Sequence, residues 1–199
     1  RQDPTFDARI DPETGQTLIS GMGELHLEVL THRLTRDMNV QVNVGKPRVS
    51  YRETITGRGE AEGRFIRQTG GRGQYAVVRL AVEPHKSETG EHHIVFENRV
   101  TGGAVRREFI AATEVGVREA ARSGVLAGFP VIDIKIAMLD GQEHEVDSSE
   151  LAFENAGRIG FEEAVKLASP ALMEPIMKLE LSVPDVYFGS VTGDLNARR

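Results

Sequence analysis

The stretch from Val131 to Leu167 constrains the fold most, because a strand pattern and a helix pattern follow each other with one short connection between them. In Val131 to Leu139, Asp133 and Lys135 alternate with isoleucines, which is the period of two that a strand requires. Ser148 to Leu167 carries apolar residues at helical spacing: Leu151, Ala152, Ile159 and Val165. We therefore predict a strand and a helix packed together in an α+β unit.

The connection between these two elements holds a single histidine. Asp140-Gly141 is a turn-forming dipeptide, so we expect the strand to end there. Asp147 is placed to cap the following helix, and Glu150 would complete a capping box. His144 then lies on a short loop between two rigid elements, a position typical of a contact residue.

The remaining patterns predict further strands and helices on both sides of this unit. Strands are expected at Thr5–Ile10, Gln16–Ser20, Asn39–Val44, Val49–Ile55, Gly63–Gln68, Tyr75–Val82 and Ile94–Asn98. Helices are expected at Gly23–Met38 and at Glu108–Arg122, the second with Ile110, Val117 and Ala121 on its apolar face and Gly124 as its stop. Ala171 to Val183 is expected to be extended, and Pro184 to open a last helix.

Composition limits the kinds of partner. The net charge of -6 argues against a protein that binds nucleic acid over a large basic surface, so any RNA contact must be a local patch. The absence of cysteine excludes disulfides and thiolate metal sites and fits a reducing cytoplasm, which is the localisation we expect. No apolar run reaches eighteen residues, so we expect no membrane span and no membrane partner.

Seven motifs along the chain resemble those of one family, in the order that the family has them. They are Gly15–Glu28, Gly45–Pro47 with Tyr51–Ile55, Gln68–Tyr75, Leu126–Val131, Asp140–Glu150, Glu174–Met177 and Gly193–Arg199. This series closely resembles elongation factor G, the ribosomal translocase, and it covers essentially the whole chain. A series of this kind is far more specific than any one of its motifs.

The resemblance implies a piece of a larger protein in three parts. Residues 1–47 resemble the latter part of domain III, a partial ferredoxin-like domain; residues 48–172 resemble domain IV, a ribosomal-protein-like βαβ domain. Residues 173–199 resemble the first strand and helix of domain V, a second ferredoxin-like domain. We expect GTP and Mg²⁺ to be bound by a domain of the parent protein that precedes this chain. Because no Gly-x-x-x-x-Gly-Lys-Ser/Thr loop is present, we expect this chain neither to bind nor to hydrolyse GTP, to need no cofactor and to catalyse no reaction itself.

The implied function is that of a mechanical arm. In the family, domain IV enters the ribosomal A site, in the decoding region, and promotes movement of transfer RNA and messenger RNA. The implied partner is therefore the ribosome rather than a small-molecule substrate. The implied contact residues form two loops at one exposed end: Gln68, Thr69, Gly70, Gly71, Arg72, Gly73, Gln142, Glu143, His144 and Glu145. Arg64, Arg67 and Arg72 would add a local positive zone.

Other interpretations stay open from the residues alone. The glycine-rich loop is compatible with a plain hairpin loop, and His144 with a solvated loop residue; no spacing of histidines predicts a metal site. Gln142-Glu143 stands where the family commonly has Ser-Tyr, and the stretch Val105-Arg106-Arg107-Glu108 lacks a proline that is common at that point. These departures keep open a specialised paralogue that acts in ribosome recycling or ribosome protection. An enzyme that uses His144 with Asp147 or Glu150 as acid and base is the alternative from another class.

Overall fold

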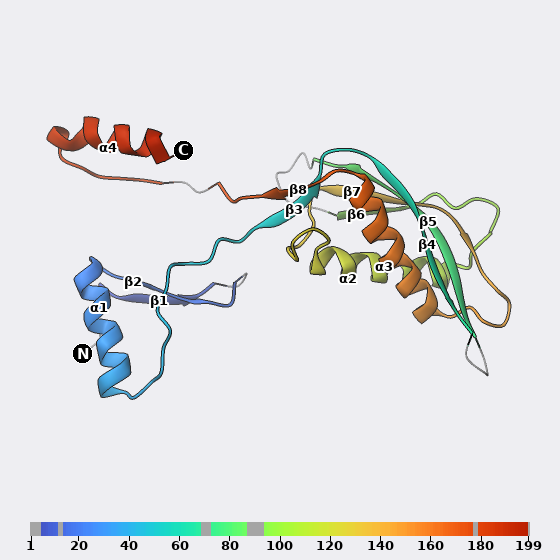
Figure 1. Cartoon of the computed structure of the whole chain (residues 1–199), viewed down its shortest axis with the longest axis horizontal. Coiled ribbons are helices and arrows are strands. Elements are labelled where there is room, and N and C mark those ends of the chain that lie inside the picture. The colour runs from blue at the N-terminus through green and yellow to red at the C-terminus, as the bar shows by residue number, and fades with distance from the viewer. Residues whose placement is uncertain (1–4, 12–13, 69–72, 87–93, 177–178, 199) are drawn as a thin grey trace.

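The computed structural model describes residues 5–11, 14–68, 73–86, 94–176 and 179–198. These residues form a central α+β domain, with a small N-terminal unit and a C-terminal helix joined to it by extended chain (Figure 1). The expected α+β fold class is confirmed. Among the described residues, no helix has the length and apolar character needed to cross a membrane.

The N-terminal unit is a hairpin followed by a helix. Strand β1 (Asp7–Ile10) pairs antiparallel with β2 (Thr17–Ser20), and α1 (Glu24–His32) continues into a π-helical turn at Arg33–Asp37. The predicted strand Asn39–Val44 is wrong, since no described strand pairs with it. Its alternating valines therefore stay on the surface: Val40, Val42 and Val44 are 46%, 39% and 61% exposed.

The central domain is a four-stranded sheet with two helices on one face (Figure 1). Its strands, in spatial order, are β4 (Gly59–Arg67), β5 (Gln74–Pro84), β7 (Ile134–Gln142) and β6 (Ile94–Asn98). All neighbours are antiparallel except β6 and β7, which run parallel and are connected through α2 (Arg107–Ser123). The second helix, α3 (Glu150–Leu167), follows β7. The expected βαβ crossover is thus β6-α2-β7.

A second, two-stranded sheet closes the base of this domain. Strand β3 (Arg52–Ile55) pairs antiparallel with β8 (Pro170–Met173), so the chain enters and leaves the domain at the same end. Helix α4 (Asp185–Arg198) comes last, and Pro184 lies just before it. The extended segment predicted from Ala171 onward is therefore a strand only as far as Met173.

The core between sheet and helices depends on small residues. The buried face of α3 consists of Ala152, Phe153, Ala156, Gly157, Gly160, Phe161, Ala164 and Val165. The predicted apolar face was partly wrong, because Leu151 and Ile159 are 56% and 37% exposed. A Cβ on Gly63 of β4 would lie 2.0 Å from the Ala156 carbonyl oxygen. The helix approaches the strand too closely at this point for position 63 to carry any side chain.

The connection between β7 and α3 differs from the prediction in two places. Strand β7 continues through Asp140 and Gly141 to Gln142, with a bulge opposite Arg79 and Leu80, so the predicted turn at this dipeptide is wrong. The helix is capped by Ser149, whose Oγ accepts a hydrogen bond from Ala152 N at 3.2 Å. Asp147, the predicted cap, makes other bonds.

Candidate nucleic-acid interface

The end of the sheet opposite the base brings the β4–β5 hairpin and the β7–α3 connection together. Gly73 N donates to Asp147 Oδ1 at 3.1 Å, and Tyr75 N donates to Asp147 O at 2.9 Å. Ser148 Oγ donates to Tyr75 O at 2.7 Å. The start of β5 is therefore bonded to the turn that carries His144. Of the predicted glycine-rich loop, Thr69 to Arg72 lie outside the described residues, whereas Gln68 and Gly73 lie within them.

His144 is fixed by its backbone and by one ring nitrogen. Its N–H donates to Ser148 Oγ at 2.8 Å, and its carbonyl accepts from Ser148 N at 3.2 Å. Its Nδ1 accepts from the N–H groups of Val146 and Asp147, both at 3.3 Å. Because 53% of the side chain is exposed, the turn holds the ring in place without covering it.

Tyr75 is a tip residue that the sequence did not single out as a contact. Its ring centroid lies 6.0 Å from that of His144, with the planes tilted by 53°. Its hydroxyl group donates to Gln142 Oε1 at 3.1 Å. The only sequence signal was its place at the start of a strand directly after the glycine-rich motif. Tyr75 thus gives the tip an aromatic ring, although position 143, where the family commonly has tyrosine, is a glutamate.

Glu143 does not add a free negative charge to the tip. Its Oε2 accepts from the backbone N–H of Arg106 at 3.1 Å, and the guanidinium Nε of Arg106 lies 3.3 Å from its Oε1. Arg106 also lies over the Phe109 ring, 4.3 Å from its centroid, and pairs with Glu108 at 3.0 Å. Gln142-Glu143 and the stretch Val105 to Glu108, the two places at which the chain departs from the family pattern, therefore contact each other through Glu143 and Arg106.

Two of the three arginines of the predicted positive zone lie within the described residues. Arg64 Nε lies 3.3 Å from Glu62 Oε1, and the Arg67 guanidinium lies 5.0 Å from the centroid of the Phe65 ring. Arg72 is outside the described residues. Glu145 is exposed on the turn, next to His144. The positive zone therefore stays a prediction.

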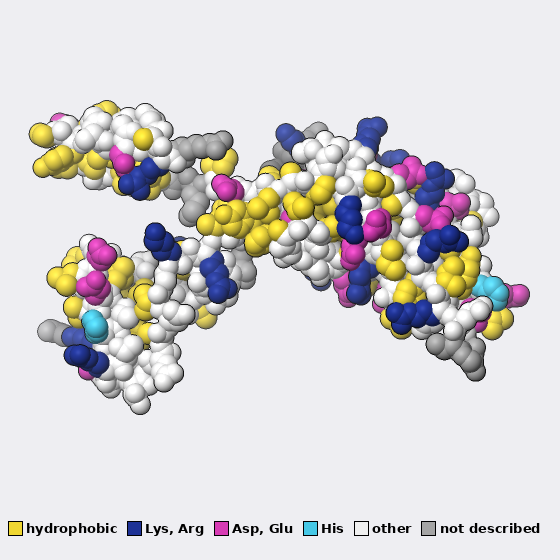
Figure 2. All heavy atoms as spheres, viewed as in Figure 1, with side chains coloured by type: hydrophobic (Ala, Val, Ile, Leu, Met, Phe, Trp, Pro, Cys, Tyr) yellow, Lys and Arg dark blue, Asp and Glu magenta, His cyan; other side chains and the backbone are white. Residues whose placement is uncertain are grey.

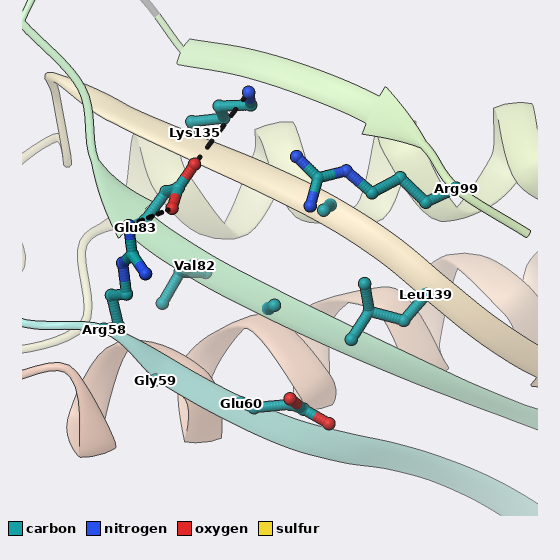
Figure 3. A pocket seen from close by; sticks show the side chains of 10 residues that line it. Arg58, Gly59, Glu60, Val82, Glu83, Arg99, Lys135 and Leu139 are labelled. Carbon is teal, nitrogen blue, oxygen red and sulfur yellow. Dashed lines mark ion pairs between the residues drawn. The ribbon is translucent and has the colours of Figure 1, made fainter.

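A second surface feature is a shallow hollow on the helix-free face of the sheet (Figure 3). It has a volume of about 360 Å³ and a floor that includes Ala81, Ala137 and Leu139. Glu83 at its rim pairs with Arg58 at 3.3 Å and with Lys135 at 3.9 Å. These rim charges neutralise one another, and charges of both signs are interspersed over the domain surface (Figure 2).

Lys135 and Arg99 also affect a neighbouring carboxyl on this face. The hydrogen bond from Lys135, at 2.6 Å, is the main cause that lowers the pKa of Glu97 from its ordinary value, and Arg99 adds to it at 2.7 Å. Glu97 therefore stays ionised. The sheet face presents a balanced set of ion pairs rather than a cationic patch.

Neither metal binding nor acid–base chemistry is supported at the tip. Within the described ranges, no three His, Asp or Glu side chains converge as metal ligands. His144 Nδ1 lies 3.7 Å from Asp147 Oδ2, but that nitrogen accepts backbone hydrogen bonds, and Asp147 Oδ1 accepts one from Gly73. The ring nitrogen that faces Asp147 is thus occupied by backbone hydrogen bonds, so the arrangement favours a contact surface over a catalytic pair.

Comparison with known proteins agrees with the resemblance seen in the motifs. The family profile described as "Elongation factor G, domain IV" matches residues 47–169, and "Elongation Factor G, domain III" matches residues 1–46. A crystal structure of a protein from Thermus thermophilus is similar over 99% of this chain, with 41% sequence identity and a TM-score of 0.79. This chain spans only 29% of that protein's length.

Proposed function

Because this chain belongs to the elongation factor G family, we propose that its central domain is the arm with which the parent protein enters the ribosomal A site. There it promotes the joint movement of transfer RNA and messenger RNA through the decoding region of the ribosome. The parent hydrolyses GTP in a different domain. The role of this chain is to position RNA and to form hydrogen bonds with it, and the chain makes or breaks no covalent bond.

The joined tip is the observation that carries this proposal. Hydrogen bonds from Gly73 and Tyr75 to Asp147 bring the start of β5, which directly follows the glycine-rich motif, and the His144 turn to the same end of the sheet. That end lies opposite β3 and β8, through which the domain is connected to the rest of the chain (Figure 1). A rigid domain attached at one end and bearing hydrogen-bonding groups at the other is suited to reach into a confined RNA site.

The tip chemistry fits RNA recognised by its shape and backbone. Most protein contacts to nucleic acids go to phosphate and sugar, and polar side chains and backbone N–H groups make many of them. The tip offers the half-exposed ring of His144 and the neighbouring ring of Tyr75. Aromatic rings beside hydrogen-bonding groups are also how proteins contact unstacked RNA bases. No strong positive field is required, because the contact is local.

A charge-introducing variant of the full-length parent tests this function. His144→Asp places a carboxylate that RNA phosphates repel, so translocation should slow by about tenfold or more, a barrier increase of about 1.4 kcal/mol. Ribosome-stimulated GTP hydrolysis should change little, since that chemistry lies in another domain. Rapid-kinetic measurement of both reactions with the same protein checks the expectation.

His85→Asp is the matched control, because it makes the same change at the opposite end of β5, beyond Pro84. It should translocate at the wild-type rate. Equal loss of hydrolysis and translocation in the His144 variant, or no loss of either, would contradict the proposal. Ribosome splitting measured with the same two variants distinguishes a translocation role from a recycling role.

A further inference from the structure

We propose that the tip turn locks His144 as the Nε2–H tautomer, so that the ring offers the RNA one hydrogen-bond donor and recognises an acceptor oxygen. This inference rests on the proposed ribosomal role of the tip and specifies its chemistry. An imidazole ring free in solution can both donate and accept. In this turn, the accepting nitrogen is already occupied.

The tautomer follows from the partners of Nδ1. The backbone N–H groups of Val146 and Asp147 both point to this atom, at 3.3 Å. A backbone N–H can only donate, so Nδ1 must present a lone pair to them. The single ring hydrogen of the neutral imidazole is then on Nε2.

The competing tautomer would place a hydrogen on Nδ1 and direct it toward the Asp147 carboxylate. Oδ2 of Asp147 lies 3.7 Å from Nδ1, which exceeds the 2.7–3.2 Å of a protein N–H···O hydrogen bond. The other oxygen, Oδ1, already accepts from Gly73 N at 3.1 Å. A hydrogen on Nδ1 would also face two amide hydrogens. The geometry therefore favours Nε2–H over Nδ1–H.

The turn is held firmly enough to keep this ring orientation. Ser148 is 5% exposed, and its Oγ accepts from His144 N at 2.8 Å while donating to Tyr75 O at 2.7 Å. Rotation of the ring away from its position would break the two hydrogen bonds that Nδ1 accepts from the Val146 and Asp147 amides. Nε2, the ring nitrogen farther from the backbone, is left to meet a partner.

The consequence is a directional preference at the tip. An Nε2–H group bonds to phosphate, ribose or carbonyl oxygens and gives nothing to a group that can only donate. Glu143, the neighbouring carboxylate, is bonded to Arg106 and does not compete for the ring. The His144 ring therefore offers RNA a donor for its oxygens.

The tautomer can be measured without a ribosome. Long-range ¹H–¹⁵N correlation spectra of the ¹⁵N-labelled 199-residue chain report the protonated nitrogen of each of its 6 histidines. The loss of one signal in His144→Asn identifies His144. We expect a fixed Nε2–H pattern for this residue. An Nδ1–H pattern, or the average of two tautomers, would overturn the inference whatever the translocation rates are.

Two substitutions separate the two ring nitrogens in the full-length parent. Asparagine places an amide oxygen where Nδ1 lies and keeps the acceptor of the turn, but nothing of its side chain reaches the Nε2 position. Glutamine places an N–H donor near the Nε2 position but not an acceptor at Nδ1. If the outward donor meets an RNA oxygen, His144→Gln should translocate about three- to tenfold faster than His144→Asn.

The matched controls His85→Asn and His85→Gln should both translocate at the wild-type rate. An asparagine variant as fast as the glutamine variant, or faster, would overturn the donor role. If the spectra show Nε2–H but both His144 variants, and His144→Asp as well, move RNA at the wild-type rate, the proposed function of the tip fails instead. The two failures are thus distinguishable.

Discussion

Glu53 shows how one side chain can organise a distant loop. Glu53 is only 1% exposed. Its carboxylate accepts four backbone hydrogen bonds: from Val125 at 2.7 Å, Leu126 at 2.8 Å, Ala127 at 2.7 Å and Phe129 at 3.0 Å. Burial alone would raise the pKa of this carboxyl, but the four N–H donors together lower its pKa below the ordinary value. The loop after α2 is thereby fixed to β3 at the base of the arm.

We predict that Glu53→Gln lowers the free energy of unfolding of the central domain by about 2–4 kcal/mol. The amide oxygen can still accept, but the amide nitrogen would face two N–H donors and leave them unsatisfied in a buried site. Denaturation followed by circular dichroism checks this. Glu62→Gln, a change of the same kind on exposed β4, should cost less than about 1 kcal/mol.

The same carboxylate predicts the pH dependence of stability. Its folded pKa is lowered, so its contribution is fully present above the unfolded pKa of about 4.3 and is lost as the pH falls through the folded pKa. The wild-type domain should lose stability over this acidic range, and Glu53→Gln should lose less. Equal acid sensitivity of the two proteins would show that Glu53 is not the responsible group.

Only some of the residues that matter for the tip and the base could be identified from the sequence. Sequence reasoning identified His144 and its turn, because a histidine between a strand pattern and a helix pattern is visible locally. It missed the role of Glu53, whose donors lie at least 72 positions away along the chain. It could not pair Glu143 with Arg106 either, because a helix start and a strand end meet only through tertiary folding.

At the scale of elements, close approach of backbones decides the packing. Gly116 of α2 lies against α3, where an added Cβ would be 2.0 Å from the Glu154 carbonyl oxygen. Gly63 of β4 also lies against α3, where an added Cβ would be 2.0 Å from the Ala156 carbonyl oxygen. Backbone atoms cannot move aside as a side chain can, so these glycines fix the distances between α2, α3 and the sheet.

We predict that Gly116→Ala destabilises the central domain by about 1–3 kcal/mol, although alanine is the better helix former. The added methyl group would force α2 away from α3. Gly57→Ala is the control in the same domain, because its Cβ would meet its nearest atom at an ordinary 3.4 Å. Urea denaturation compares the two, and a stabilised Gly116→Ala would refute the close-packing account.

The elements themselves were largely predictable, and the errors have physical causes. Periodicity located both helices and all four strands of the central sheet to within a few residues. It failed at Asn39–Val44, where the alternation is present but no described strand pairs with it. It also failed at Asp140-Gly141, where pairing with β5 continues the strand across a dipeptide that would otherwise turn.

At the scale of the whole molecule, the C-terminal segment exposes the apolar residues that a fuller domain would cover. Ile176, Val186 and Phe188 are 101%, 88% and 65% exposed, and apolar side chains gather on α4 (Figure 2). None of the described residues of α4 is buried. This pattern supports the proposal that residues 173–199 begin a further domain of the parent.

We predict that amide hydrogens of residues 174–198 exchange much faster than those of α2 and α3 in a monomer of this chain. Few tertiary contacts protect them, so local opening costs little free energy. Strand β8 should exchange more slowly, because it is paired with β3. Hydrogen exchange read by mass spectrometry tests this, and uniformly slow exchange from 174 to 198 in a verified monomer would contradict it.

The family domains III and IV, which match residues 1–46 and 47–169, could be predicted in this order because motifs in series are visible in the sequence. The joining of the two tip loops required the fold, since Gly73 and Asp147 are 74 positions apart. Local patterns indicate which residues are exposed on loops. They do not indicate which loops share an end of a sheet.

The most direct test of the central claim is a cryo-electron-microscopy structure of the full-length parent bound to a ribosome during translocation. We expect residues 142–147 to contact RNA in the ribosomal A site, with His144 Nε2 at hydrogen-bonding distance, about 3 Å, from an RNA oxygen. A structure in which this turn faces solvent, or packs only against protein while the arm lies outside the A site, would contradict it.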